Sequence, residues 1–206
     1  KATKGIYELG STLKLITAAI AFESKLINEN EVFDVSKPLK VSSKIINDFH
    51  PLSYSINIPE VIVHSSNIGS AKIAEKFGPS TQLKFLKALG LTNILPLEIP
   101  ELGKPQVIMD KKVLTTMTIS YGHGISITPM HLASVTATIV NDGIKVDPTL
   151  ILDKTVQKNK KIISSETSMK MKSIMRLVVS NEHGTAKKAE VSGYLVGGKT
   201  GTAEKI

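Results

Sequence analysis

Three short motifs contain residue types that could together perform nucleophilic catalysis. A serine hydroxyl is a weak nucleophile until a neighbouring base takes its proton, and a lysine amine with a depressed pKa can be that base. A serine followed three residues later by a lysine therefore suggests chemistry through a serine nucleophile. The motifs are Ser11-Thr12-Leu13-Lys14, Ser65-Ser66-Asn67 and Lys199-Thr200-Gly201-Thr202.

The surroundings of Lys14 distinguish the first motif from a chance match. Chance alone predicts about two Ser-x-x-Lys matches in this chain, and such a match is most simply a helix cap followed by an exposed lysine. However, Lys14 is the only charged residue between Glu8 and Glu23, in a segment that is apolar almost all round. Burial there would lower the pKa of the Lys14 amine, and the spacing lets the amine reach the Ser11 hydroxyl. The helix N-terminus would supply N–H groups where negative charge develops.

The other two motifs also have simpler structural interpretations. The Ser65-Ser66-Asn67 segment could be a helix cap, and Gly201 could be a strand glycine at a bulge. Alternatively, Gly201 removes a side chain where a substrate backbone lies along a sheet edge. The functional interpretation therefore depends on the conjunction of the three motifs, in this order, at a helix start, in a loop between helices and on a late strand.

Helices and one late strand are expected to position these motifs. The segment 28–57 is polar and contains prolines, so loops with short elements are expected there. Residues 191–203 combine apolar residues with several glycines, which predicts a buried strand that another chain approaches closely. Apolar periodicity and capping residues predict helices at 11–22, 59–63, 67–77, 80–89, 111–121, 129–140 and 165–179.

Length and composition restrict the class of protein. The chain has 206 residues, 41% of them hydrophobic, which is enough for one domain that could have two lobes. The net charge is +8, but the lysines are scattered, Arg176 is the only arginine and 4% of residues are aromatic, so no nucleic-acid partner is expected. The chain has no cysteine, and its five histidines lack metal-type spacing, so no disulfide or metal site is expected. No apolar stretch is long enough to span a bilayer.

The chain resembles the penicillin-binding proteins and serine β-lactamases, whose three signature motifs follow the order found here. Longer segments are similar to the class B penicillin-binding proteins, in particular to the division-septum group. Leu9 departs from the pattern, because the family usually has proline there. The segments that carry the resemblance, which extends over nearly the whole chain, are Tyr7–Lys14, His64–Gly69, Tyr121–Pro129 and Gly193–Ala203.

The resemblance implies an α/β (α+β) transpeptidase fold, in which helices flank an antiparallel sheet and an all-α lobe is added. Family catalytic domains have strands before the nucleophile helix and further elements after the Lys-Thr-Gly strand. Residues 1–206 are therefore expected to be a fragment of a transpeptidase domain whose sheet is incomplete at both ends. An unpaired strand at Lys199 would favour self-association and weaken penicillin binding.

The resemblance also implies catalytic roles for four residues. Ser11 would attack the carbonyl of a penultimate D-alanine, and Lys14 would accept the proton of the Ser11 hydroxyl. Ser65 would relay a proton to the departing D-alanine. Lys199 would bind the terminal carboxylate of the substrate. Because the acyl-enzyme divides one difficult step into two easier ones, no metal or organic cofactor is needed.

Four further residues would bind the substrate. Asn67 would hold the amide on the acyl side, and Thr200 would share the terminal carboxylate with the preceding lysine. Gly201 would leave room along the strand. The backbone N–H group of Thr202 would form the oxyanion hole together with that of Ser11.

The implied function is a serine D,D-transpeptidase that cross-links peptidoglycan stem peptides ending in D-Ala-D-Ala, is inhibited by β-lactams and acts in septal wall synthesis. Two alternatives are left open: a D,D-carboxypeptidase or β-lactamase-type hydrolase, and a non-catalytic β-lactam sensor. A β-lactamase would need a deacylating base, and no acidic residue is convincingly placed. The family further implies division or elongation membrane proteins as partners, through regions outside this chain. It also implies a location at the periplasmic face of the bacterial inner membrane, with an N-terminal anchor outside these residues.

Overall fold

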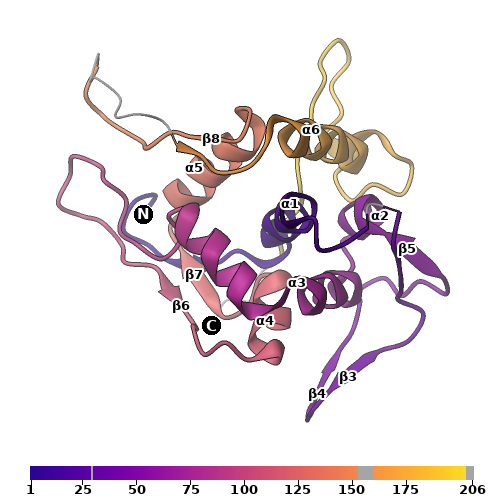
Figure 1. The fold of residues 1–206 in the computed structure, drawn as a ribbon. Coiled ribbons are helices and arrows are strands. Elements are labelled where there is room, and N and C mark those ends of the chain that lie inside the picture. The colour runs from indigo at the N-terminus through magenta and orange to yellow at the C-terminus, as the bar shows by residue number, and fades with distance from the viewer. Residues whose placement is uncertain (29, 153–159, 203–206) are drawn as a thin grey trace.

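The computed structural model describes residues 1–28, 30–152 and 160–202, in which helices surround one central helix and short strands lie at the periphery (Figure 1). All strand pairs of this part of the chain are antiparallel. The helices are η1 (Gly10–Leu13), α1 (Lys14–Ser24), α2 (Ile58–Val63), α3 (Asn67–Ala88), α4 (Val113–Ser120), α5 (Pro129–Val140), α6 (Ser165–Ser180) and η2 (Lys187–Ala189). The strands are β1 (Tyr7–Glu8), β2 (Val32–Asp34), β3 (Leu39–Val41), β4 (Lys44–Ile46), β5 (Ser55–Asn57), β6 (Gln106–Val107), β7 (Ile125–Ile127), β8 (Ile144–Lys145) and β9 (Lys160–Lys161).

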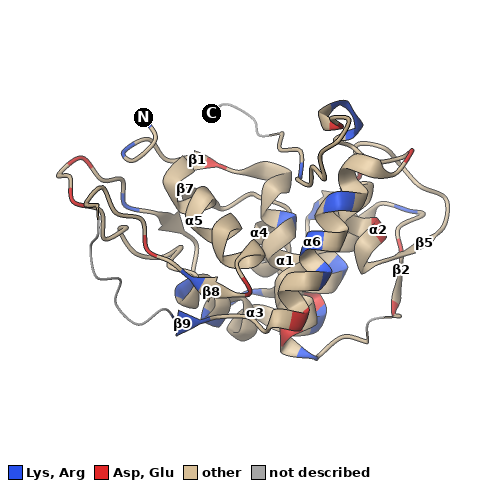
Figure 2. Ribbon diagram, turned by 90° about the horizontal axis from the view of Figure 1, so that it is seen from above, with Lys and Arg blue, Asp and Glu red and all other residues tan. Residues whose placement is uncertain are grey.

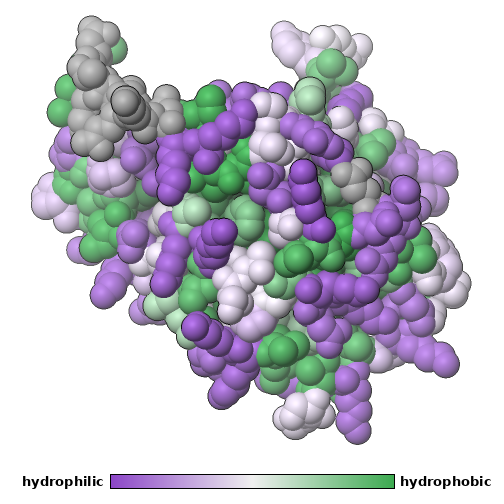
Figure 3. Space-filling model, viewed as in Figure 1, coloured by the Kyte–Doolittle hydropathy of each residue, from purple (hydrophilic) through white to green (hydrophobic). Residues whose placement is uncertain are grey.

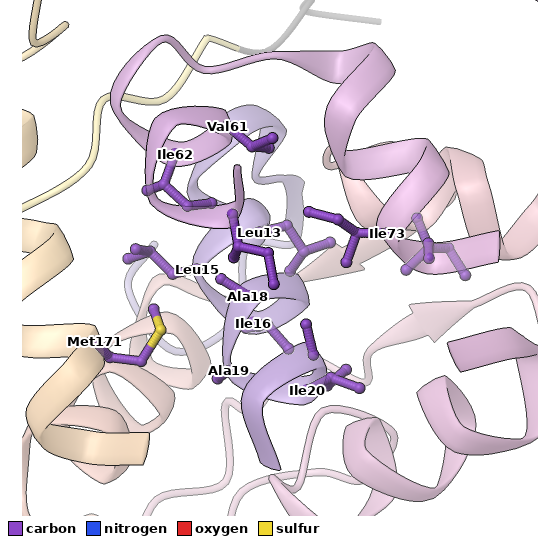
Figure 4. Close-up of a cluster of buried hydrophobic side chains, with 14 of the residues drawn as sticks. Leu13, Leu15, Ile16, Ala18, Ala19, Ile20, Val61, Ile62, Ile73 and Met171 are labelled. Atoms are coloured by element: carbon purple, nitrogen blue, oxygen red, sulfur yellow. The ribbon is translucent and has the colours of Figure 1, made fainter. Parts of the chain in front are cut away.

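The central helix α1 is apolar because other helices cover it. It packs against α2, α3 and α6, which surround it in Figure 1. Figure 4 shows Ile62 of α2, Ile73 of α3 and Met171 of α6 among the side chains that meet α1. Ala18 and Ala21 are completely buried, and their small side chains let the neighbouring helices approach closely. The start of α1 is thereby fixed inside the core, and the Ser-x-x-Lys motif runs from η1, which contains Ser11, to Lys14, the first residue of α1.

The sequence around α2 and α3 explains where these two helices begin. At α2, the Asn57 side chain accepts a hydrogen bond from the Glu60 N–H, and the Glu60 carboxylate accepts one from the Asn57 N–H, which is a capping box. Ser66 caps α3 by accepting a hydrogen bond from the Gly69 N–H. Inside α3, Gly78 has φ 73° and ψ 171°, so the helix is kinked and continues in a new direction.

A small sheet leads directly into the first motif. Strand β7 lies between β1 and β6, with Tyr7 opposite Ile127 and Gln106 opposite Ser126. Ile125 and Ile127 point into the core and are completely buried. Because β1 is followed within two residues by the turn η1, this sheet fixes the position at which the turn begins.

The sequence correctly predicted the helices but not the late strand. All seven predicted helices are confirmed, with 67–77 and 80–89 forming the two arms of the kinked α3. The predicted strand at 191–203 is wrong for 191–202, which form no strand, and Ala203 lies outside the described residues. A strand needs a paired neighbour, whereas here the Gly198 N–H donates to the Met175 carbonyl of α6. Leu195 is 91% exposed, so the segment is not buried either.

The surface is polar and mixed in charge. In Figure 2, basic residues lie on α6, on β9 and in several loops, and acidic residues lie among them. Figure 3 shows hydrophobic surface in patches that hydrophilic side chains separate. Within the described residues, no helix is long and apolar enough to cross a membrane.

Candidate active site

The turn η1 contains Ser11, the predicted nucleophile, and is called the nucleophile turn below. It is held by a contact between two glycines. Ser11 is the second residue of η1, so the predicted helix start at Ser11 is wrong by one residue. The Ser11 side chain does not cap η1, and no other side chain caps it. Gly10 has φ 53° and Gly122 has φ 109°, and the Gly10 N–H donates to the Gly122 carbonyl at 3.3 Å. A Cβ atom on Gly122 would lie 1.9 Å from the Gly10 carbonyl oxygen. Only glycine therefore fits at position 122.

The Lys14 amine is completely buried and is surrounded by oxygen atoms. Its Nζ lies 2.7 Å from Ser11 Oγ, 2.7 Å from Asn67 Oδ1, 2.9 Å from the Ser65 carbonyl oxygen and 3.2 Å from Ser65 Oγ. Among the described residues, no carboxylate forms an ion pair with Lys14. The structure thus brings the first two motifs together around one amine.

This arrangement can direct the lone pair of a neutral lysine at the serine hydroxyl. Burial and the neighbouring Lys199 cation lower the pKa of Lys14 to about 7, so much of the amine is neutral at neutral pH. The Ser65 carbonyl and Asn67 Oδ1 can only accept hydrogen bonds, so they take the two hydrogens of a neutral amine. The remaining lone pair can then accept the hydrogen of the Ser11 hydroxyl at 2.7 Å.

Asp48, which no sequence pattern marked as a site residue, positions the second motif. Its carboxylate accepts hydrogen bonds from the Ser66 hydroxyl at 2.7 Å and from the Ile68 N–H at 3.0 Å, at the N-terminus of α3. Ser65 stands outside the helix with φ 59°, a left-handed conformation that a serine adopts only under constraint. Ser66 is thus the helix cap, while Ser65 and Asn67 face Lys14.

The third motif lies on the other side of Ser65. Lys199 Nζ donates to Ser65 Oγ at 2.9 Å, and Thr200 Oγ1 donates to Thr185 Oγ1 at 2.9 Å. Burial lowers the pKa of Lys199 to about 8, so this amine is mostly charged at pH 7. A Cβ atom on Gly201 would lie 2.9 Å from Thr12 Cγ2, so the glycine lets this segment pack closely on the nucleophile turn.

The three motifs line one cavity of about 500 Å³. Of the residues predicted to act in catalysis or binding, Lys14, Lys199 and Gly201 are not among those that line the cavity. Gly201 packs on the nucleophile turn. The cavity also has an aromatic and histidine lining that the sequence analysis did not assign to the site. Its lining residues are Ser11, Phe49, His50, His64, Ser65, Asn67, Tyr121, His123, Thr185, Thr200 and Thr202.

The histidines of the cavity differ in their partners. His123 Nδ1 lies 2.8 Å from Glu8 Oε2, and the same carboxylate accepts a hydrogen bond from the Gly124 N–H at 2.8 Å. The His64 ring contacts the exposed His183 ring at a centroid distance of 5.9 Å. Partial burial lowers the pKa of His64. The only sequence signal for His123 was its place in the Tyr121–Pro129 segment.

The chain is similar to a known protein family and to several curated proteins. A family model described as the penicillin-binding protein transpeptidase domain matches residues 1–206. The probable peptidoglycan D,D-transpeptidase FtsI of Caulobacter vibrioides is 36% identical, with 100% of this chain and 35% of that protein covered. The penicillin-binding protein PbpB of Mycolicibacterium smegmatis is 32% identical, with 97% and 34% covered. The chain spans about a third of the length of these relatives.

Solved structures confirm the predicted transpeptidase fold. The transpeptidase domain of penicillin-binding protein 3 from Burkholderia pseudomallei superposes with a TM-score of 0.92 at 26% identity, with 100% of this chain and 63% of that chain covered. A peptidoglycan glycosyltransferase from Burkholderia ambifaria also gives a TM-score of 0.92 at 25% identity, with 99% and 66% covered. Because the family model covers the whole chain and the FtsI and PbpB relatives exceed 30% identity, the chain belongs to the penicillin-binding protein transpeptidase family, in its class B division-septum group.

Proposed function

We propose that this chain carries the catalytic centre of a peptidoglycan D,D-transpeptidase that forms an acyl-enzyme on Ser11 and is inhibited by β-lactams. One observation carries the proposal: a completely buried lysine amine lies 2.7 Å from the Ser11 hydroxyl, with a pKa lowered to about 7. The FtsI relative, which is named a probable peptidoglycan D,D-transpeptidase, supports cross-linking over hydrolysis as the reaction.

In the acylation step, Ser11 Oγ attacks the carbonyl carbon of the penultimate D-alanine as Lys14 takes the hydroxyl proton. The proton passes through Ser65 Oγ, which lies 3.2 Å from Lys14 Nζ, to the nitrogen of the departing D-alanine. Lys199 holds the terminal carboxylate, with Thr200 beside it. The acyl group remains as an ester on Ser11 until the amine of a second stem peptide attacks it.

Substrate binding and the oxyanion hole complete the proposal. Asn67 holds the amide on the acyl side of the bond, and Gly201 leaves room along the segment. The backbone N–H groups of Ser11 and Thr202 stabilise the negative charge that develops on the carbonyl oxygen. The substrates lie in the cell wall, so the proposal places the domain at the periplasmic face of the inner membrane, in septal synthesis.

Labelling of Ser11 by penicillin tests this proposal. We expect a fluorescent penicillin to acylate the full-length protein that contains this chain, and peptide mass spectrometry to place the adduct on Ser11. The Ser11→Ala variant should take up no label, whereas Ser70→Ala, which removes a buried hydroxyl of α3 outside the cavity lining, should be labelled normally. An adduct on another serine would overturn the assignment.

The rate of acylation should depend on pH in a bell-shaped manner. Lys14 must be neutral to take the proton, so the rate rises as pH passes about 7, the value to which burial lowers its pKa. Lys199 must be charged to hold the carboxylate, so the rate falls above about 8, where its amine loses the proton. The Lys199→Arg variant stays charged, so the high-pH decline should disappear in the residual activity. A wild-type rate that still rises at pH 9.5 would contradict the roles of both lysines.

A further inference from the structure

The proposed transpeptidation requires a proton transfer that the three motifs do not provide. The acceptor amine of a stem peptide is protonated at neutral pH and has no lone pair with which to attack the ester. Once neutral, its attack on the acyl-enzyme is the reverse of acylation, so Ser65 and Lys14 can return the second proton to Ser11 Oγ. A further base that borders the cavity can take the first proton of the ammonium group and so supply the neutral amine inside the site.

The structure offers one histidine with the features of such a base. His123 lines the same cavity as Ser11, and its side chain is 41% exposed. Glu8 lies beside His123 Nδ1 at 2.8 Å, and the Gly124 N–H fixes the other carboxylate oxygen. Within the described residues, Nε2 of His123 makes no hydrogen bond. The other two histidines of the cavity lining, His50 and His64, form no ion pair with a carboxylate within the described residues.

The Glu8 carboxylate determines the tautomer of the ring. Partial burial raises the pKa of Glu8, but the hydrogen bonds from His123 and Gly124 outweigh this effect and lower the pKa, so the carboxylate is ionised at neutral pH. An ionised carboxylate only accepts hydrogen bonds, so Nδ1 of the neutral imidazole carries the hydrogen and Nε2 carries the lone pair. The same carboxylate stabilises the imidazolium that forms when Nε2 takes a proton.

We propose that His123, oriented by Glu8, removes a proton from the acceptor ammonium group and so produces the neutral amine that attacks the acyl-enzyme. The N–H bond breaks, its electron pair stays on nitrogen, and the proton bonds to Nε2 and later leaves to solvent. The amine nitrogen then bonds to the ester carbon, the bond from this carbon to Ser11 Oγ breaks, and the second proton passes through Ser65 and Lys14 to Ser11. This inference rests on the proposed function of the site.

Two variants and two acceptors test the inference in the full-length protein. The donor is an N-benzoyl-D-alanyl thioester of thioglycolate, and transfer is measured at pH 7 to D-alanine, whose amine is protonated, and to hydroxylamine, whose amine is neutral. The His123→Asn variant can keep a hydrogen bond to Glu8 but has no atom at the Nε2 position. Glu8→Gln can keep both hydrogen bonds, but its amide N–H donates to Nδ1, which places the hydrogen on Nε2 and removes the lone pair.

Both variants should transfer to D-alanine about 100-fold more slowly than the wild type, with penicillin acylation of Ser11 and transfer to hydroxylamine within threefold of wild type. His183→Asn is the matched control, because His183 pairs with Glu182 at 3.3 Å outside the cavity lining, and it should leave all three rates unchanged.

Three other results have distinct meanings. Transfer to D-alanine within threefold of wild type in both variants would overturn the role of His123 and leave the proposed function standing. Equal losses with both acceptors, or loss of acylation, would show that the pair only supports the nucleophile turn and would overturn the inference as well. A wild-type protein that is not acylated at Ser11 would instead overturn the proposed function.

Discussion

The Lys14→Ala variant should acylate Ser11 about 1000-fold more slowly than the wild type, because no other base lies in place to take the hydroxyl proton. Among the described residues, Lys14 Nζ is the only ionisable side-chain atom hydrogen-bonded to Ser11 Oγ. The rate is measured with a fluorescent penicillin under conditions where acylation is first order in enzyme.

Two controls separate proton transfer from packing. Lys14→Met keeps the volume of the side chain without the amine, so it should be as slow as Lys14→Ala while unfolding at a temperature close to that of the wild type. Lys87→Ala removes an exposed lysine of α3 and should acylate normally. A Lys14→Met rate within tenfold of wild type would rule out Lys14 as the base.

The Gly122→Ala variant should lose about 3 kcal/mol of unfolding free energy and most of its acylation activity. The added Cβ atom would lie 1.9 Å from the Gly10 carbonyl oxygen and 2.3 Å from Gly10 Cα, both in the backbone, so the nucleophile turn must move. The alanine would also have to adopt a φ of 109°. Chemical denaturation measures the first effect, and penicillin labelling measures the second.

The Gly193→Ala variant is a control that distinguishes the effect of backbone strain from that of the steric clash. Gly193 has φ 83°, and no atom lies within 4 Å of the position where its Cβ would be. Gly193→Ala should therefore cost about 1 kcal/mol, from backbone strain alone, and leave acylation intact. If the two variants were equally stable, the contact between Gly10 and Gly122 would not hold the nucleophile turn.

The sequence predicted the helices well because their signals are local. Asn57, Ser66, Thr128 and Ser164 all cap the helices that they precede, and each accepts a hydrogen bond from the backbone N–H group three residues later. The predicted strand at 191–203 is wrong for 191–202 because strand formation is not a local property. Its glycines and apolar residues fit a strand, but pairing depends on a neighbour that the local sequence does not reveal, and residues 196 and 198 bond to α6 instead.

The residues of the candidate site also differ in whether their contacts are local in the sequence. The spacing of Ser11 and Lys14 within one turn and the apolar surroundings predicted their contact, which the structure places at 2.7 Å. Asp48 and the pair of Glu8 and His123 could not be found from spacing, because their partners lie 18 and 115 residues away in the sequence. Burial of Lys14 depends on the packing of α1 against α2, α3 and α6, a tertiary effect that the apolar helix pattern only suggested.

The central claim is that the buried amine of Lys14 is partly neutral at physiological pH and can activate Ser11. The most direct measurement is an NMR titration of the full-length protein labelled with ¹³C at lysine Cε, in which the Lys14 signal is assigned by its loss in Lys14→Met. We expect a midpoint at about 7, because burial and the nearby Lys199 cation both disfavour the charged form. A midpoint at about 10, the value of an exposed lysine, would contradict it.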